Sequence, residues 1–148
     1  LVVRGICCLK AGVPGLSENI TVHSIVGNFL EHARIFYFEN GGSPEVYMGS
    51  ADWMPRNLDK RVEIMFPVED PALKEQVIHI LKVQLADNVK AHILQPDGTY
   101  EKIDKRGKVL VTAQEQFCEE AVAMAKAATA RDDVHNTRVF VPSEGQGL

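Results

Sequence analysis

The sequence lacks any run of about 18 consecutive apolar residues, so no segment is typical of a membrane-spanning helix. Its first residues also lack the charged start and the small-residue cleavage site of a secretory signal peptide. Cysteine is scarce: Cys7, Cys8 and Cys118 are odd in number and follow no CxxC spacing, which argues against a disulfide framework and a metal site. These absences predict a cytoplasmic protein with reduced, buried thiols.

Basic charge is also in short supply. The 148 residues contain 16 Lys and Arg against 20 Asp and Glu, a formal net charge of -4, and the deficit falls after residue 61. Nonspecific binding to nucleic acid or to a membrane surface would need a basic face. We therefore predict no nucleic-acid partner, and we expect any bound anion to be held by a few placed groups.

Apolar residues are plentiful. At 45% hydrophobic, the chain suits one compact domain with a substantial core, which we place at residues 1–127, followed by a polar, flexible tail at 128–148. The chain starts at Leu1 without Met and inside a strand-like pattern. This start predicts an excised fragment, so that a site completed by this domain would have its other half upstream.

Five stretches have the apolar or alternating pattern of strands: 1–9, 20–26, 34–38, 45–48 and 61–66. Arg4 interrupts the first stretch, which is otherwise typical of a buried strand. The stretch 34–38 is apolar on both faces, which argues against a half-exposed hairpin. In 61–66, polar and apolar side chains alternate, so Arg61 is predicted to point away from the core.

Helix signals follow these strands. Asp70 as N-cap and Pro71 at the first helical position predict a helix over 71–87, and a second helix is predicted to begin at Thr112. Between them, 89–103 has the pattern of a hairpin with its turn at 95–98. The predicted buried faces comprise Leu73, Val77, Ile80 and Leu81 in the first helix and Phe117, Cys118, Ala121 and Val122 in the second. Strands followed by helices on one core predict an α/β domain with a mixed sheet packed with helices.

Two short motifs lie between these elements. The stretch HARIFYFE, 32–39, and the tetrapeptide GSAD, 49–52, resemble the H-x-K-x4-D and G-S-x-N motifs of the phospholipase D superfamily. Arg34 stands for Lys, Glu39 for Asp and Asp52 for Asn, so charge is kept at two positions and an anion replaces a possible donor at the third. In that superfamily the His accepts a phosphoryl group or donates a proton, which here indicates His32.

Three longer segments carry a more specific resemblance. RGICCLKAGVPGLSENI at 4–20, SIVGNFLEHARIFYF at 24–38 and YMGSADWMPRNLDKRVE at 47–63 are similar to the C-terminal, second phospholipase D-like domain of bacterial long-chain-type polyphosphate kinases. The resemblance implies a phospholipase D-like α/β fold and reversible transfer of the terminal phosphoryl group of ATP to inorganic polyphosphate. Transfer would pass through a phosphohistidine in the preceding domain.

The same resemblance implies the partners and the site. Mg²⁺, ATP or ADP, polyphosphate and the upstream domains of the same polypeptide are the expected partners, in a homo-oligomer when full length. The location would be cytoplasmic, with peripheral association on the inner face of the membrane left open. By position in the motifs, Arg4, His32 and Arg61 would face the nucleotide phosphates, with His32 as a catalytic residue.

Elementary chemistry supports these residue types. A guanidinium in a buried strand needs an anion, so Arg4 predicts either a phosphate or an ion pair with Asp52 or Asp59. His32 suits a general acid or base because its proton is mobile near neutral pH. Trp53 either anchors its loop, together with Met54, or stacks on a nucleobase. A wider phosphate-tunnel wall would comprise Lys10, Arg34, Ser50, Arg56, Asn57 and Lys60, and we assign no metal to protein side chains.

Two other functions stay open. The chain is also compatible with a single-motif phospholipase D-like nuclease that completes its site as a homodimer, although Arg34 and Asp52 depart from that pattern and the net charge is acidic. A noncatalytic domain for polyphosphate binding or assembly is the third reading. Because the phosphoaccepting His would lie elsewhere, we predict that this chain alone has no kinase activity.

Overall fold

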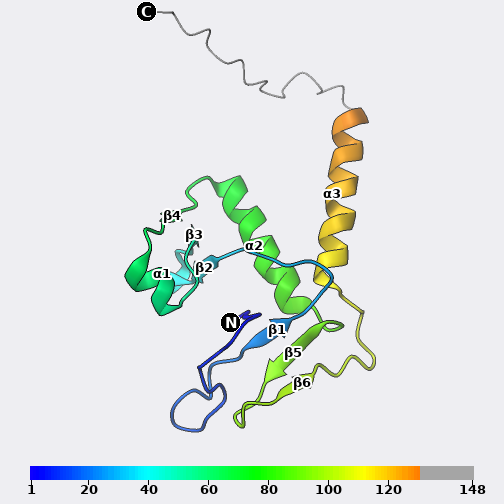
Figure 1. Cartoon of the computed structure of the whole chain (residues 1–148). Coiled ribbons are helices and arrows are strands. Elements are labelled where there is room, and N and C mark those ends of the chain that lie inside the picture. Colours follow the sequence, from blue (N-terminus) through cyan, green and yellow to red (C-terminus); the bar gives the residue numbers. More distant parts are fainter. Residues whose placement is uncertain (131–148) are drawn as a thin grey trace, which may run out of the picture. The chain divides into compact units, whose positions relative to one another are not determined.

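The structure is a computed structural model that describes residues 1–130. The chain divides into two compact units, one from Leu1 to Gln116 and one that begins at Phe117. Two small sheets and helix α2 make up most of the first unit (Figure 1). The predicted tail, 128–148, falls from residue 131 onward outside the described residues.

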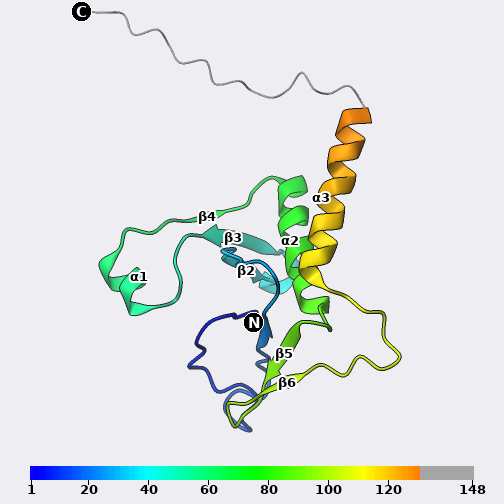
Figure 2. The ribbon, with the colours of Figure 1, turned by 45° about the vertical axis from the view of Figure 1, so that its right-hand side comes forward.

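The sheet that carries the motifs contains β2 (Ile35–Phe38), β3 (Glu45–Gly49) and β4 (Met65–Pro67) in that order, and both pairings are antiparallel. A short 3-10 turn, η1 (Asn40–Gly42), links β2 to β3. The buried core under the sheet consists of Val46, Val68 and Val77, with Val77 contributed by α2. Helix α1 (Pro55–Lys60) lies on the connection between β3 and β4, at the end of the sheet away from α2 (Figures 1 and 2).

The second sheet contains β1 (His23–Ile25), β5 (Ala91–Leu94) and β6 (Tyr100–Lys102), in the order β1-β5-β6 with antiparallel pairing. Its core is Ala11, Val22 and Leu94. The predicted hairpin at 89–103 is confirmed: the Gly98 N–H donates to the Gln95 carbonyl at 2.9 Å, and Gly98 supplies a φ of 89° that favours glycine.

The helices begin where their caps predict. Helix α2 (Pro71–Ala86) starts after Asp70, whose side chain accepts the Leu73 N–H at 2.9 Å. Helix α3 (Ala113–Ala130) starts after Thr112, and the Ala113 N–H donates to Asp87 Oδ2 at 2.8 Å. The predicted α/β class with sheets and helices is therefore confirmed, and a parallel bridge between Val2 and His23 joins the antiparallel ladders.

Several local predictions are wrong. Residues 1–9 form no regular strand and Arg4 is exposed, because the isolated Val2–His23 bridge is the pairing that this stretch makes. Strand 34–38 does belong to a half-exposed hairpin, and Phe38 is 51% exposed. Residues 61–64 lie outside β4, which leaves Val62 fully exposed.

Burial also differs from the prediction on the helices and cysteines. In α2, Val77 is buried but Leu73 is 54% exposed. In α3, Cys118 and Val122 are exposed, so the predicted buried stripe is wrong. The three thiols are free, and Cys7 is half-buried while Cys8 and Cys118 are exposed.

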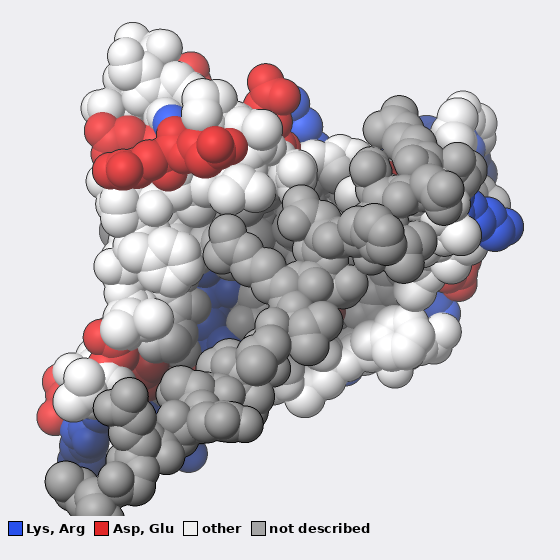
Figure 3. All heavy atoms as spheres, turned by 90° about the horizontal axis from the view of Figure 1, so that it is seen from above, with Lys and Arg blue, Asp and Glu red and all other residues white. Residues whose placement is uncertain are grey.

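Among the described helices, none is both long and apolar enough to cross a membrane. On the part of one face that the described residues form, acidic and basic side chains lie in several separate groups (Figure 3).

Candidate functional site

The strand register brings the two motifs together. Ile35 pairs with Met48 at the start of the β2–β3 hairpin, and the Gly49 N–H donates to the Arg34 carbonyl at 3.0 Å. The residues just before β2 and just after β3 are therefore neighbours. We call residues 27–34 the His32 segment and residues 49–64 the site loop.

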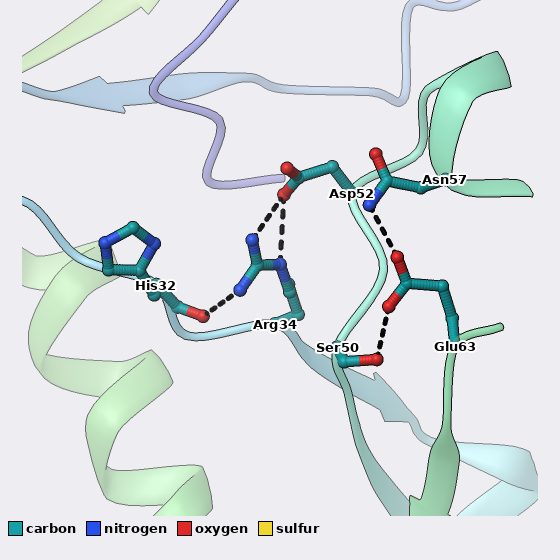
Figure 4. Close-up of polar contacts among 6 residues, drawn as sticks. All are labelled: His32, Arg34, Ser50, Asp52, Asn57 and Glu63. Carbon is teal, nitrogen blue, oxygen red and sulfur yellow. Dashed lines mark hydrogen bonds and ion pairs between the residues drawn. The ribbon is translucent and has the colours of Figure 1, made fainter. Parts of the chain in front are cut away.

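Arg34 links the His32 segment to the site loop by hydrogen bonds. Its Nε donates to Asp52 Oδ1 at 3.0 Å, and its Nη2 lies 2.9 Å from the same oxygen (Figure 4). Its Nη1 donates to the His32 carbonyl at 2.7 Å. The guanidinium thus fixes the backbone at His32 and the carboxylate of the site loop at once, and its side chain is only 25% exposed.

A second network closes the site loop on itself. The Ser50 hydroxyl donates to Glu63 Oε2 at 2.5 Å and accepts the Ile64 N–H at 3.0 Å. Asn57, buried in α1, donates from Nδ2 to the other oxygen of Glu63 at 2.7 Å (Figure 4). Both oxygens of Glu63 therefore have partners, one at the start of the loop and one in α1.

These contacts determine the charge state of the two carboxyl groups. The hydrogen bond from Arg34 holds the pKa of Asp52 below its usual range, and Arg34, Arg56 and His32 add favourable charge. The hydrogen bonds from Ser50 and Asn57 lower the pKa of Glu63, with a further contribution from Arg61. Both carboxylates are ionised at neutral pH.

The remaining cations of the loop are differently placed. Arg56, Lys60 and Arg61 are exposed, and within residues 1–130 no hydrogen bond or ion pair engages their side chains. Pro55 at the first turn starts α1, and Arg61 follows its last residue in extended conformation. The imidazole of His32 is likewise exposed.

Two predicted residues lie apart from this cluster. Arg4 donates from Nη1 to the Phe29 carbonyl at 2.6 Å, so it contacts the His32 segment but not the site loop. Its alternative ion pair with Asp52 or Asp59 is not formed among the described residues, and Asp52 is bound by Arg34 instead. Lys10 is exposed, and no described contact joins it to the cluster; its backbone carbonyl accepts the hydroxyl of Ser17, which lies outside the cluster.

Trp53 contributes to the loop by one contact. Its ring stacks on Phe36, with centroids 5.8 Å apart and an interplanar angle of 19°, yet the residue is 79% exposed. Met54 is 42% exposed. The predicted anchoring is therefore limited to the Phe36 stack, and the role of a nucleobase platform stays a prediction.

Glu63, which organises the second network, is a site residue that the sequence patterns did not predict. It occupies a polar position in a predicted alternating strand, and no motif singles it out. The only available signal was the acidic residue placed two positions after Arg61, inside the segment that resembles the kinases.

The family model described as polyphosphate kinase C-terminal domain 2 matches residues 1–114. The chain belongs to this family. The polyphosphate kinase of Lactiplantibacillus plantarum is 49% identical over 143 residues, which is 96% of this chain and 20% of the relative. Polyphosphate kinase 1 of Chlorobaculum tepidum is 59% identical over 117 residues, 79% of this chain and 17% of the relative.

The fold agrees with that of a solved polyphosphate kinase. The crystal structure of the enzyme from Porphyromonas gingivalis superposes with a TM-score of 0.79 at 40% identity, covering 85% of this chain and 19% of that one. This polyphosphate kinase domain thus spans about a fifth of the length of the relatives it matches.

Proposed function

We propose that this chain is part of a polyphosphate kinase that reversibly transfers the terminal phosphoryl group of ATP to inorganic polyphosphate. The group would pass through a phosphohistidine that a preceding domain of the enzyme supplies. This domain would contribute the cations that bind the nucleotide and polymer phosphates. The family match over residues 1–114 supports the reaction class, and the site geometry supports the division of labour.

The observation that carries the proposal is the contrast between satisfied carboxylates and unengaged cations. Asp52 and Glu63 are bound by Arg34, Ser50 and Asn57. Arg56 and Arg61 are exposed beside them, with no described ion pair in residues 1–130. Transfer of a phosphoryl group depends mainly on positioning and on stabilising charge spread over its oxygens, which placed guanidinium groups do well.

Each proposed ligand has a distinct role. Arg61 and Arg4 would donate to phosphate oxygens of the nucleotide. His32 would exchange a proton with the transferring group or with the attacked histidine as a general acid or base. Arg56 and Lys60 would extend the phosphate wall by charge alone, with Lys10 as its outermost member.

The other predicted wall residues fit a positioning role better. Arg34 already donates to Asp52 and to the His32 backbone, and Ser50 gives its only hydroxyl proton to Glu63. Asn57 is buried and bound to the same carboxylate. We therefore propose that Arg34, Ser50 and Asn57 hold the loop in shape while the exposed cations contact phosphate.

Mg²⁺ would enter with the nucleotide. Among residues 1–130, no group of three or more His, Cys, Asp or Glu side chains is arranged to hold a metal ion, and Asp52 and Glu63 are already engaged. Magnesium in such enzymes is commonly bound through substrate phosphates. We further propose a homo-oligomer acting in the cytoplasm, either free or held peripherally on the inner face of the membrane.

A chimera tests this function. This chain replaces the matching segment of the Lactiplantibacillus plantarum polyphosphate kinase, and His32→Ala, Arg4→Ala and Arg61→Ala are compared with the exposed control Lys82→Ala. Polyphosphate formation from ATP and the trapped phosphoenzyme are measured, with circular dichroism as the check on folding. Loss of a general acid or base is expected to lower kcat by about 10²- to 10⁴-fold.

The outcomes separate the roles. Collapse of both phosphoenzyme and polymer in a folded His32→Ala chimera supports a part in transfer. Unchanged synthesis would make His32 structural and leave the phosphate contacts to Arg4 and Arg61. The unmodified 148-residue chain alone is expected to show no ATP-dependent synthesis, and detectable synthesis would contradict the need for a separate phosphoaccepting domain.

The nuclease alternative receives less support from the geometry. A phospholipase D-like nuclease would need Arg34 and Ser50 free to hold a phosphodiester, whereas both are bound to carboxylates here. Nuclease activity in a dimer of defined size would restore that alternative. A noncatalytic binding role predicts instead that the chimera binds polyphosphate but is insensitive to His32→Ala.

A further inference from the structure

Two buried glutamines hold the side chain of Glu31, the residue before His32. Gln84 of α2 donates from Nε2 to Glu31 Oε2 at 2.7 Å. Gln114, in the first turn of α3, donates from Nε2 to Glu31 Oε1 at 2.8 Å. Both glutamines are more than nine-tenths buried, at 8% and 7% exposed. Each oxygen of Glu31 therefore has a buried amide partner.

Gln114 also binds the backbone of the His32 segment. The Phe29 N–H donates to Gln114 Oε1 at 2.9 Å, and Gln114 Nε2 donates to the Phe29 carbonyl at 2.8 Å. A side-chain amide thus pairs with a peptide group in the way that a neighbouring strand would. The carbonyl oxygen of Gln114 accepts one hydrogen bond and its amide nitrogen donates two, so every polar atom of the side chain has a partner.

Gly27 makes this pairing possible, because the Gln114 side chain lies where a Cβ atom of residue 27 would be. A Cβ atom added to Gly27 would lie 2.2 Å from Gln114 Oε1 and 2.6 Å from its Cδ. Any other residue would therefore displace a buried side chain that makes three hydrogen bonds. The glycine is required here for space, not for backbone conformation.

The same segment carries His32 and accepts a hydrogen bond from Arg4, and both residues are proposed phosphate ligands. The Phe29 carbonyl that accepts from Gln114 also accepts from Arg4 Nη1 at 2.6 Å. His32 follows Glu31 directly, and its carbonyl is held from the other side by Arg34. The glutamines therefore fix one end of the His32 segment and Arg34 fixes the other.

We propose that Gln114, assisted by Gln84 and admitted by Gly27, is a positioning residue that sets the placement of His32 and Arg4 for phosphoryl transfer. It touches no substrate in this role and acts through the Phe29 peptide and the Glu31 carboxylate. The effect on phosphoryl transfer rests on the proposed function, whereas the hydrogen-bond arrangement around Gln114 does not. The start of α3 is thereby made part of the site support.

The variants separate hydrogen bonding from packing. Gln114→Ala removes the amide, Gln114→Glu keeps the size and one acceptor but removes both donors, and Gly27→Ala displaces the side chain. Gln76→Ala on the exposed face of α2 is the matched surface control. Val77→Ala, in the core under the β2–β3–β4 sheet, is the control for general loss of stability.

The first measurement uses this chain by itself. Hydrogen exchange followed by NMR reports the Phe29 amide, whose acceptor is Gln114 Oε1. We expect its protection to fall about tenfold in Gln114→Ala and Gly27→Ala, the effect of losing one hydrogen bond. The amide of Leu94, in the sheet core, should keep its protection. Unchanged protection of Phe29 in Gln114→Ala overturns the inference.

The second measurement uses the chimera described above. Gln114→Ala and Gln114→Glu are expected to lower kcat/KM for ATP by about 10- to 100-fold, as misplacement of reacting groups does. The phosphoenzyme, once formed, should be as stable as in the wild-type chimera. The inference is overturned if Val77→Ala, at equal or greater loss of thermal stability, lowers kcat/KM as much. If His32→Ala has no effect on synthesis, the proposed function fails, and the exchange experiment still judges the hydrogen-bond arrangement.

Discussion

The site loop and the first ten residues, which we call the leading segment, were both expected to supply phosphate ligands, but different contacts hold them. In the site loop, Ser50, Asp52, Asn57 and Glu63 have side-chain partners within the loop or on the His32 segment. In the leading segment, the described attachments are mostly made by the backbone: the Val2–His23 bridge, the Leu1 amine on the Thr21 carbonyl and the Lys10 carbonyl, which accepts the Ser17 hydroxyl. Arg4 adds one side-chain hydrogen bond, and Val3 and Cys7 pack on the core of the second sheet.

The difference shows how each region obtains its shape. A loop without regular structure becomes rigid when its polar groups satisfy one another, because each unmade bond in a buried place is costly. Apolar residues alone do not fix a strand, since a strand needs a neighbour for its peptide groups. We therefore expect the site loop to be preorganised and the leading segment to open at lower free energy.

The largest effect is expected from placing a like charge inside the site loop. Asn57→Asp sets a buried carboxylate against Glu63, and we expect a loss of about 3 kcal/mol in the free energy of unfolding at pH 7. Asn57→Ala removes a hydrogen bond without adding charge and should destabilise by about 1–2 kcal/mol. Urea unfolding followed by circular dichroism measures both.

Asn19→Asp is the matched control, because it adds the same charge at an exposed position. It should change stability by less than about 0.5 kcal/mol. If Asn57→Asp were no more harmful than Asn19→Asp, the buried contact between Asn57 and Glu63 would contribute nothing, and the view of a preorganised loop would fail.

A second prediction compares the two arginines directly. Arg34→Ala breaks both contacts with Asp52 Oδ1 and the bond to the His32 carbonyl, so we expect a loss of about 1 kcal/mol after allowing for partial exposure. Arg4→Ala breaks one exposed hydrogen bond and should have less than about half that effect. Equal losses in parallel unfolding curves would remove the distinction between the two regions.

Acid should affect the two regions in different pH ranges. Burial lowers the pKa of His23, which pairs with the leading segment, so its charging opposes folding as the pH falls below about 6.5. The lowered pKa values of Asp52 and Glu63 mean that their stabilisation is complete at neutral pH and is lost only below about pH 4.

The chain has one tryptophan, Trp53, which reports the site loop by fluorescence, while the protection factor of the Val3 amide reports the leading segment. Val3 protection should decline first on acidification, and Trp53 emission should change later. In His23→Gln the early decline should disappear. A single transition shared by both probes in the wild-type chain would show that the regions unfold together.

Sequence patterns predicted the elements whose signals are local. The Asp70 cap and Pro71 located α2, and the turn before Gly98 located the β5–β6 hairpin. The pattern at 61–66 failed because Pro55 starts α1, after which the chain has an extended connection before β4 begins at Met65. An alternating pattern specifies a face only when a partner strand is present.

For the site, the motif resemblance covers both His32 and Asp52, whose neighbourhoods are joined by Arg34 in the structure. It did not identify Glu63 or Gln114, because their partners lie 13 and 85 residues away in the chain. A single sequence carries no record of such distant hydrogen bonds, and neither residue belongs to a recognisable motif. The residues that support a site are therefore harder to predict from a sequence than the ligands that they hold in place.

The smallest effects on folding are expected from the exposed lysines at the edge of each region. Lys60 ends α1 and Lys10 ends the leading segment, and no described side-chain contact holds either one. Lys60→Ala and Lys10→Ala should therefore change the free energy of unfolding by less than about 0.5 kcal/mol.

In the chimera, however, Lys60→Ala should weaken binding of polyphosphate and reduce its salt dependence, because a charge near a rigid loop stays close to the bound chain. Lys10→Ala should do so less, since a loosely held segment places its charge over a wider region. Binding measured against salt concentration tests this order, and a larger effect of Lys10→Ala would mean that the leading segment becomes the better ordered of the two when polyphosphate is bound.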